Sequence, residues 1–220
     1  METELKLSLN EADLPRLLTH PLLAKDADTQ RLLNTYFDTP DLALQQRRMA
    51  VRERLAGDQW LLTVKAAGQS QNGLSRRQEW EGPTTPGALQ FDTLVDDAAL
   101  AADLMAMRPR LKAVFCTDFE RQRWLIDHAG ARIEVALDQG RIHVPGTDLS
   151  ERLLELDLEL LKGSEDALMA LADVLRQTPQ GSAILLPSDA SKAQRGMALS
   201  RQAIKRLASK VTVFVQKSKP

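Results

Sequence analysis

The chain has 220 residues and a mass of 24.4 kDa, with 43% hydrophobic and 27% charged residues, enough to bury the core of one large domain or two small ones. Its 29 lysines and arginines nearly balance 30 aspartates and glutamates, which excludes the broad basic field of sequence-independent nucleic-acid binding and makes any basic site local. A lone Cys116 and three scattered histidines exclude an internal disulfide and a zinc site built on cysteine or histidine.

The amino-terminal residues 1–10 alternate in charge where a signal peptide would carry an apolar run. No segment approaches the roughly 18 apolar residues of a membrane span. We therefore expect a soluble, cytoplasmic protein that has neither a membrane nor a nucleic acid as partner. Aromatic residues make up only 4% of the chain, which leaves few platforms for stacking bases.

Changes in the hydrophobic period divide the first half of the chain into short elements. We expect a strand over residues 2–9, a short helix over 11–19 capped by Asn10, a strand over 34–38 and a helical turn over 42–46. Met49–Leu55 and Trp60–Ala66 flank a turn that contains Gly57, which predicts a hairpin. A strand over Leu74–Glu81 follows Asn72-Gly73, and a helical segment over about 92–107 follows two prolines.

The second half begins with strands and ends with helices. Arg110–Asp127 is long enough for one extended strand, Arg132–Asp138 is expected to join Arg141–Val144 through Gln139-Gly140, and Leu153–Leu161 is the last strand. Helical spacing begins at Ser164, and a second helix is expected over 189–207. Roughly eight strands in mostly antiparallel order favour an α+β protein with a sheet able to close on itself.

Charged side chains recur on one face of seven of these strands. Alternation along each strand gives the groups Glu2, Glu4 and Lys6; Arg52 and Arg54; Lys65; Arg77, Glu79 and Glu81; Arg121 and Arg123; Glu134 and Asp138; and Glu155, Asp157 and Glu159. Each face alone is typical of the solvated side of an antiparallel sheet. The opposite faces are strongly apolar and need a cover of helices, and in a barrel covered from outside the charges would point inward.

Charges of both signs inside a barrel need partners of opposite sign. Arginine and lysine suit the oxygens of linked phosphates, while clustered carboxylates without histidine suit a hard cation such as Mg²⁺ or Mn²⁺. A polyphosphate bound with such a metal ion satisfies both sets of charges.

The order of these residues resembles the CYTH superfamily, the triphosphate tunnel metalloenzymes, and is most similar to its bacterial inorganic triphosphatases. The matching segments are Glu2-Thr3-Glu4-Leu5-Lys6, Tyr36-Phe37-Asp38-Thr39-Pro40, Arg52-x-Arg54, Lys65, Arg77-x-Glu79, Thr117-Asp118-Phe119 with Arg121 and Arg123, Arg132-Ile133-Glu134, Asp138-Gln139-Gly140, Glu155-Leu156-Asp157-Leu158-Glu159, Ser191-Lys192 and Arg195-Gly196. The resemblance implies a closed eight-stranded antiparallel β-barrel over residues 1–204, with helices packed outside. It leaves residues 205–220 as a tail of unknown role, without the C-terminal CHAD domain that many relatives carry.

The resemblance also assigns roles to individual residues. The metal-binding set would be Glu2, Glu4, Glu134, Glu155, Asp157 and Glu159, with the pair used among the last three left open. Substrate phosphates would be held by Lys6, Arg52, Arg54, Lys65, Arg77, Arg121, Arg123 and Lys192. The catalytic set would be Lys6, Arg54, Lys65 and Glu79, Asp138 is a weaker candidate, and Tyr36 is interpreted as structural.

These roles predict hydrolysis of inorganic triphosphate to pyrophosphate and phosphate, with Mg²⁺ or Mn²⁺ as the cofactor. Three alternatives belong to the same superfamily: a thiamine triphosphatase, a nucleoside triphosphatase and a class IV adenylate cyclase. Thiamine triphosphatases of animals carry Trp where this chain has Ala50. A fourth alternative is a non-catalytic polyphosphate-binding module. The apolar residues 211–215 are predicted to form a strand, and either a monomer or a homodimer is compatible with the sequence.

Overall fold

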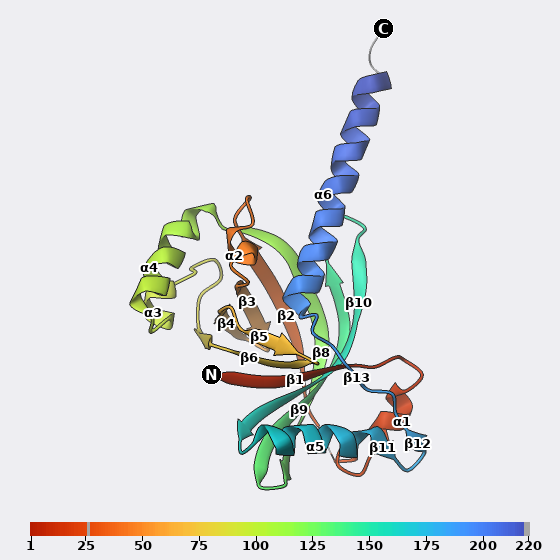
Figure 1. The fold of residues 1–220 in the computed structure, drawn as a ribbon. Coiled ribbons are helices and arrows are strands. Elements are labelled where there is room, and N and C mark those ends of the chain that lie inside the picture. Colours follow the sequence, from red (N-terminus) through yellow and green to blue (C-terminus); the bar gives the residue numbers. More distant parts are fainter. Residues whose placement is uncertain (26, 218–220) are drawn as a thin grey trace.

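The computed structural model describes residues 1–25 and 27–217, with the backbone alone for 207–217. One large, mostly antiparallel sheet curls into an open half-barrel (Figure 1). The beginning of the long helix α6 enters its concave side, and the rest of α6 projects away from the body. The strand order is β5-β6-β1-β10-β9-β8-β2-β3-β4-β7, and β13 pairs with β1.

The strands differ widely in length. They are β1 (Glu2–Ser8), β2 (Asp28–Asp38), β3 (Ala50–Ala56), β4 (Gln59–Lys65), β5 (Gln69–Gln71), β6 (Leu74–Arg77), β7 (Glu79–Pro83), β8 (Lys112–His128), β9 (Ala131–His143), β10 (Ser150–Lys162), β11 (Gln177–Thr178), β12 (Gly181–Ser182) and β13 (Leu186–Pro187). The helices are α1 (Leu14–Leu18), α2 (Ala43–Gln46), α3 (Phe91–Leu94), α4 (Ala98–Met107), the 3₁₀ turn η1 (Arg108–Arg110), α5 (Glu165–Arg176) and α6 (Lys192–Lys217).

Two apolar clusters cover the convex side of the sheet, because alternation along each strand turns its apolar residues outward. Helix α5 packs its leucines against β1, β9 and β10, and helices α3 and α4 pack against β3 and β4. A third cluster lies on the concave side, where Met197 of α6 packs near the stacked rings of Tyr36 and Phe115. The polar faces of the strands are therefore enclosed between the sheet and the start of α6.

The expectation of a closed barrel of eight strands is wrong. The sheet has 11 strands and stays open, since β5 and β7 at the two ends of its path do not pair with each other. The segment that sequence periodicity assigns to one strand, Leu74–Glu81, breaks at Gln78: β6 before it pairs with β1, and β7 after it pairs with β4. At Gln78 the chain therefore crosses from the β1 side of the sheet to the β4 side. We call the gap between these two sides the seam, and a closed barrel would need a ladder of hydrogen bonds there.

Two further expectations are corrected. Residues 131–143 form one continuous strand, and Gly140 lies within it rather than at a junction. A Cβ at Gly140 would lie 2.2 Å from the Asp118 carbonyl oxygen, so glycine is required by the close approach of β8. Residues 211–215 continue helix α6 instead of forming a strand.

Several local predictions are confirmed. Gly57 adopts φ 64° in the turn between β3 and β4, and the Ser164 hydroxyl accepts a hydrogen bond from the Ala167 amide at the start of α5. The predicted helix cap at Asn10 is wrong, because α1 begins at Leu14 and its N-cap is Asp13; Asn10 instead accepts from the Asp13 amide in the turn before the helix. Among the helices of the described chain, none combines the length and the hydrophobicity that a bilayer crossing requires.

Candidate functional site

The concave side of the sheet encloses a cavity of about 510 Å³ whose wall is mostly polar. Period-two alternation along β1, β3, β4 and β6 to β10 turns one charged side chain after another into it. Fourteen of the predicted site residues line it: Glu2, Glu4, Lys6, Arg52, Arg54, Lys65, Arg77, Glu79, Arg121, Arg123, Glu134, Asp157, Glu159 and Lys192. Glu155, the fifteenth, is buried beside the cavity wall under α6.

Lys6 lies at the centre of the carboxylates that β1 and β10 contribute. Its ammonium is 2.7 Å from Asp157, 3.2 Å from Glu4 and 3.3 Å from Glu155. The antiparallel register explains these contacts, because Lys6 lies directly opposite Asp157 and Glu4 opposite Glu159. Burial opposes the charge, but the three carboxylates outweigh it and raise the pKa of Lys6 well above its ordinary value.

A second group joins the two sides of the seam. The Lys65 ammonium on β4 is 2.9 Å from Glu2 on β1 and 2.6 Å from Glu79 on β7. Arg77 on β6 donates to Glu2 at 2.7 Å and to Glu4 at 3.1 Å. These ion pairs hold the edges of the open sheet together where no strand ladder does.

Arg52 and Arg54 on β3 are both buried, but their charges are not equally compensated. Arg52 has Glu81 at 3.4 Å and Glu79 at 3.8 Å. Arg52 donates to the Thr63 hydroxyl at 3.1 Å, and Arg54 donates to Asn34 Oδ1 at 2.9 Å. Glu81 is the nearest carboxylate to Arg54, at 3.8 Å. Burial and the neighbouring Arg52 guanidinium lower the pKa of Arg54 to about 10. Arg54 remains charged at neutral pH, so it is a cation whose surroundings favour an added anion.

Asp138, Glu155 and Asp157 form a buried cluster of carboxylates close enough together to hold a metal ion. Two ammonium groups already fill it. Lys192 of α6 contacts all three carboxylates, at 2.7 Å from Asp138 and 2.9 Å from Asp157, and Lys6 contacts Glu155 and Asp157. Burial opposes ionisation, but these cations and Arg121 lower the pKa of Asp157 well below its ordinary value.

Glu159, two residues after Asp157 on β10, lacks that compensation. Among the described residues, no cation forms a salt bridge with Glu159. Burial and the charges of Glu2, Glu134 and Glu79 raise the pKa of Glu159 to about 7. Arg123 contacts Glu134 at 3.6 Å but also pairs with the exposed Asp28. An excess of carboxylates of this kind fits a hard divalent cation.

The structure brings to the site two residues that the sequence analysis did not place in the predicted set, Tyr36, which it interpreted as structural, and Asp138, its weaker candidate. The Tyr36 hydroxyl reaches the same cavity, and although burial opposes it, the cations Arg52, Lys192 and Arg54 lower the pKa of Tyr36. Asp138 anchors Arg121 through two hydrogen bonds of 2.7 Å. Alternation with Asn34 could have placed Tyr36 on the same side of β2 as that polar residue, but its position at the end of a strand before Thr39-Pro40 favoured a structural interpretation.

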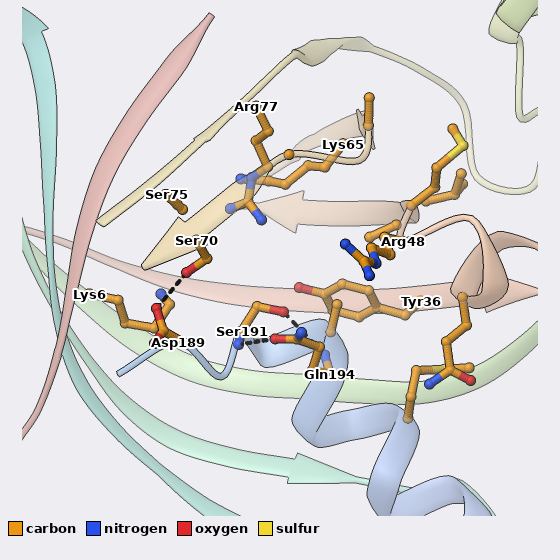
Figure 2. A pocket seen from close by; sticks show the side chains of 18 of the residues that line it. Lys6, Tyr36, Arg48, Lys65, Ser70, Ser75, Arg77, Asp189, Ser191 and Gln194 are labelled. Carbon is orange, nitrogen blue, oxygen red and sulfur yellow. Dashed lines mark hydrogen bonds between the residues drawn. The ribbon is translucent and has the colours of Figure 1, made fainter. Parts of the chain in front are cut away.

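A second cavity of about 520 Å³ adjoins the charged one and shares Lys6, Tyr36, Lys65 and Arg77 with it. Figure 2 shows Arg48 and Tyr36 on one side and the start of α6, with Ser191 and Gln194, on the other. Asp189 accepts from the Ser70 hydroxyl and the Gly73 amide, which ties the β5–β6 turn to the loop before α6. The wall of this cavity is more apolar, with Phe37, Met49 and Met197 among its residues.

The charged cavity thus places cations and carboxylates together on the concave side of one curled sheet. The chain belongs to the CYTH domain family, whose profile matches residues 1–197. It is 32% identical over 205 residues to the inorganic triphosphatase of Haemophilus influenzae, a match that covers 90% of this chain and 54% of that protein. The chain thus spans about half the length of this curated relative.

Solved structures share the fold. The Hippeastrum protein HpAC1, described as having a dominant triphosphatase activity, has a TM-score of 0.62 at 18% identity and matches 90% of this chain and 96% of its own. The Bacillus halodurans protein bh2851 has a TM-score of 0.57 at 20% identity and matches 89% of this chain and 96% of its own. At these identities the comparison establishes the architecture alone.

Proposed function

We propose that this protein hydrolyses inorganic triphosphate to pyrophosphate and phosphate with the help of a divalent metal ion. The observation that carries the proposal is the enclosed cavity itself. One group in it consists of cations and includes the poorly compensated Arg54, and the other consists of carboxylates and includes Glu159, which has no salt bridge among the described residues. A linear triphosphate brings the anions that the first group lacks, and a metal ion brings the charge that the second group lacks. The 32% identical Haemophilus inorganic triphosphatase supports the same substrate.

The cations divide into two proposed roles. Arg52, Arg54 and Arg121 present planar guanidinium groups that suit pairs of phosphate oxygens. Lys6 and Lys65 present ammonium groups that would neutralise charge on the transferred and leaving phosphates. Glu79 lies 2.6 Å from the Lys65 ammonium and would keep it directed into the cavity.

The metal ion would be held by Glu2, Glu4 and Glu159, with Glu134 and Asp157 nearby. We favour this set because Glu159 has no salt bridge among the described side chains and has Glu4 directly opposite it and Glu2 nearby. Glu2 and Glu4 each pair with two cations, whereas Glu155 is held by three, Lys6, Lys192 and Arg195. When bound, Mg²⁺ or Mn²⁺ supplies electrostatic stabilisation of the triphosphate oxygens and activates water.

The reaction needs no covalent intermediate on the protein. A water oxygen forms a bond to the terminal phosphorus while the bond from that phosphorus to the bridging oxygen breaks, and the products are phosphate and pyrophosphate. The arginines would stabilise the charge that develops on the leaving pyrophosphate. Enclosure by the sheet and α6 limits the water around these charges and so strengthens each interaction.

The second cavity favours one other candidate function, the hydrolysis of an organic triphosphate. Its partly apolar wall, with Tyr36, Met49 and Met197, adjoins the charged cavity and has room for a substituent on the terminal phosphate. Inorganic triphosphate remains the first candidate because the charged cavity alone offers cations for its phosphates and carboxylates for the metal ion.

Phosphate release from tripolyphosphate, ATP and thiamine triphosphate, each with Mg²⁺, with Mn²⁺ and with a chelator, tests both candidates. We expect metal-dependent turnover of tripolyphosphate at a higher kcat/KM than either organic substrate. Faster release from ATP or thiamine triphosphate would favour the second candidate. Binding of tripolyphosphate without turnover under any metal condition would contradict an enzymatic role.

Glu4→Gln and Glu120→Gln form a matched pair for the same assay. Glu4 lies in the cavity, while Glu120 is exposed on the convex side of β8. Loss of turnover in Glu4→Gln alone would support the proposed site, and equal activity in the two variants would contradict it.

A further inference from the structure

Arg195 belongs to a sequence motif with Lys192 and Gly196, but it does not line the charged cavity. Its guanidinium is held from three directions. Nε donates to Glu151 at 2.7 Å, Nη1 to Glu155 at 3.0 Å, and Nη2 to the Arg152 carbonyl oxygen at 2.6 Å. All three acceptors lie on β10, so these contacts fasten the first turn of α6 to that strand.

Lys192 precedes Arg195 by three residues and therefore lies on the same side of α6. Its ammonium occupies the cluster of Asp138, Glu155 and Asp157, and it also lies 5.5 Å from the centroid of the Phe119 ring. Glu155 links the two side chains, because one of its oxygens accepts from Lys192 and the other from Arg195.

Gly196 provides an independent contact at the same turn. A Cβ at this position would lie 2.1 Å from the ring of Phe115, which belongs to β8. Helix α6 can therefore approach the sheet this closely only with glycine here. The helix is thus fixed on one side by Arg195 against β10 and on the other by Gly196 against Phe115.

We propose that Arg195 is a positioning residue, which holds the first turn of α6 so that the Lys192 ammonium stays at the edge of the phosphate-binding cavity. The cluster of Asp138, Glu155 and Asp157 is then the receptor for this ammonium and not a resident metal site. A direct contact between Arg195 and phosphate is disfavoured because its guanidinium is already engaged by three acceptors on β10. The inference rests on the proposed function for its ligand, tripolyphosphate.

A double-mutant cycle on tripolyphosphate affinity tests the positioning role. Arg195→Gln and Lys192→Met are each expected to weaken binding about tenfold, and the double variant is expected to bind no more weakly than Lys192→Met alone. Arg195→Lys is expected to behave like Arg195→Gln, since one ammonium cannot reach all three acceptors. Arg31→Gln, which removes an ion pair with Asp118 on the convex side, is the control and is expected to bind like the wild type.

Three results would overturn the positioning role: unchanged affinity in Arg195→Gln, full rescue by Arg195→Lys, and additive losses in the double variant. No binding to the wild type would instead contradict the proposed function. If Arg195→Gln does not fold, Glu151→Gln takes its place in the cycle, because it removes only one of the three acceptors. Additive losses of affinity in Glu151→Gln and Lys192→Met would then contradict the positioning role.

The receptor role has a readout that does not depend on activity. In a titration with Mn²⁺ alone, followed by electron paramagnetic resonance, Lys192→Met is expected to gain a Mn²⁺ site that the wild type lacks. Adding Asp138→Asn to Lys192→Met should remove that site. Loss of a Mn²⁺ site when Asp138→Asn is made in the wild type would overturn the receptor role.

Discussion

At the scale of single residues, Arg54 combines a functional position with poor compensation of its charge. It is buried, its closest polar contact is the neutral Asn34, and its pKa is lowered to about 10. Arg54→Ala should therefore lower kcat/KM for tripolyphosphate by about 10² to 10³. The free energy of unfolding should change little, because the variant also removes an unfavourably buried cation.

Urea unfolding and steady-state kinetics on the same preparation measure both quantities. Arg31→Ala is the control, since Arg31 is an exposed residue of β2 whose ion pair with Asp118 lies outside the cavity. A loss of activity in Arg54→Ala that is matched by a large loss of stability would contradict this separation of function from folding.

Glu159 makes the stability of the metal-free protein depend on pH. Its pKa is raised from 4.5 to about 7 in the folded state. The folded protein therefore binds more protons than the unfolded chain between these values, so the contribution of Glu159 to stability is complete below pH 4.5 and is lost as the pH rises through 7. Glu159→Gln removes this loss and should stabilise the protein at pH 8 by about 1 kcal/mol, allowing for solvent screening.

Thermal unfolding of wild type and Glu159→Gln at pH 4.5 and pH 8, in the presence of a chelator, measures the effect. The difference between them should appear at the higher pH only, and saturating Mg²⁺ should remove it by compensating the carboxylates of the wild type. Glu120→Gln, on the convex side, should show neither effect. A stabilisation of Glu159→Gln that is equal at both pH values would contradict the assigned cause.

At the scale of elements, the pairing of β8 with β9 depends on Gly140. A Cβ there would meet the Asp118 carbonyl oxygen at 2.2 Å and the Phe119 Cα at 2.5 Å, both of them backbone atoms that cannot rotate away. Gly140→Ala should cost at least ~3 kcal/mol in urea unfolding. Gly130→Ala, in the turn between the same strands, has open space and only a positive φ, so it should cost about 1 kcal/mol. Similar losses in the two variants would show that close approach is not the reason for Gly140.

The same two strands show what the sequence can and cannot predict. Alternation fixes which side chains share a face, so the charged side of every strand could be predicted from neighbours two residues apart. The break at Gln78 and the need for glycine at 140 depend on how each strand pairs with its neighbours in the sheet, β1 and β4 in one case and β8 in the other. Local spacing carries no information on such pairings, which is why closure of the sheet and the continuity of β9 were predicted wrongly.

The candidate site also has features that the sequence predicts and features that it does not. Alternation and the resemblance together brought fourteen predicted residues to one cavity wall. The partners within that cavity could not be predicted, because they follow from strand register and from the position of α6. Lys192 lies against Asp138 and Asp157, and this contact between distant elements fills a cluster in which the resemblance had assigned Asp157 and Glu155 to metal binding.

At the scale of the whole molecule, the fold encloses charges that nearly cancel. The chain carries a formal net charge of −1, yet its cations and carboxylates are concentrated where the sheet curls around them. Ion pairs formed in such a cavity recover only part of the solvation free energy that the charged groups lose on folding. A ligand whose charges are opposite to those of the cavity residues that it contacts should therefore stabilise the folded state. This stabilisation should exceed that by another salt at the same ionic strength.

Tripolyphosphate with Mg²⁺ should raise the Tm of the protein, and a concentration about a hundred times Kd should raise it by roughly 5 to 10 °C. Sodium sulfate at equal ionic strength should raise Tm less, because a single tetrahedral anion cannot reach the arginines of β3 and the lysines of β1 and β4 together. Arg54→Ala should lose most of the tripolyphosphate shift and keep the sulfate shift. Equal shifts by the two salts, or an undiminished tripolyphosphate shift in Arg54→Ala, would mean that the anion acts on the surface and that the cavity is not where the protein binds it.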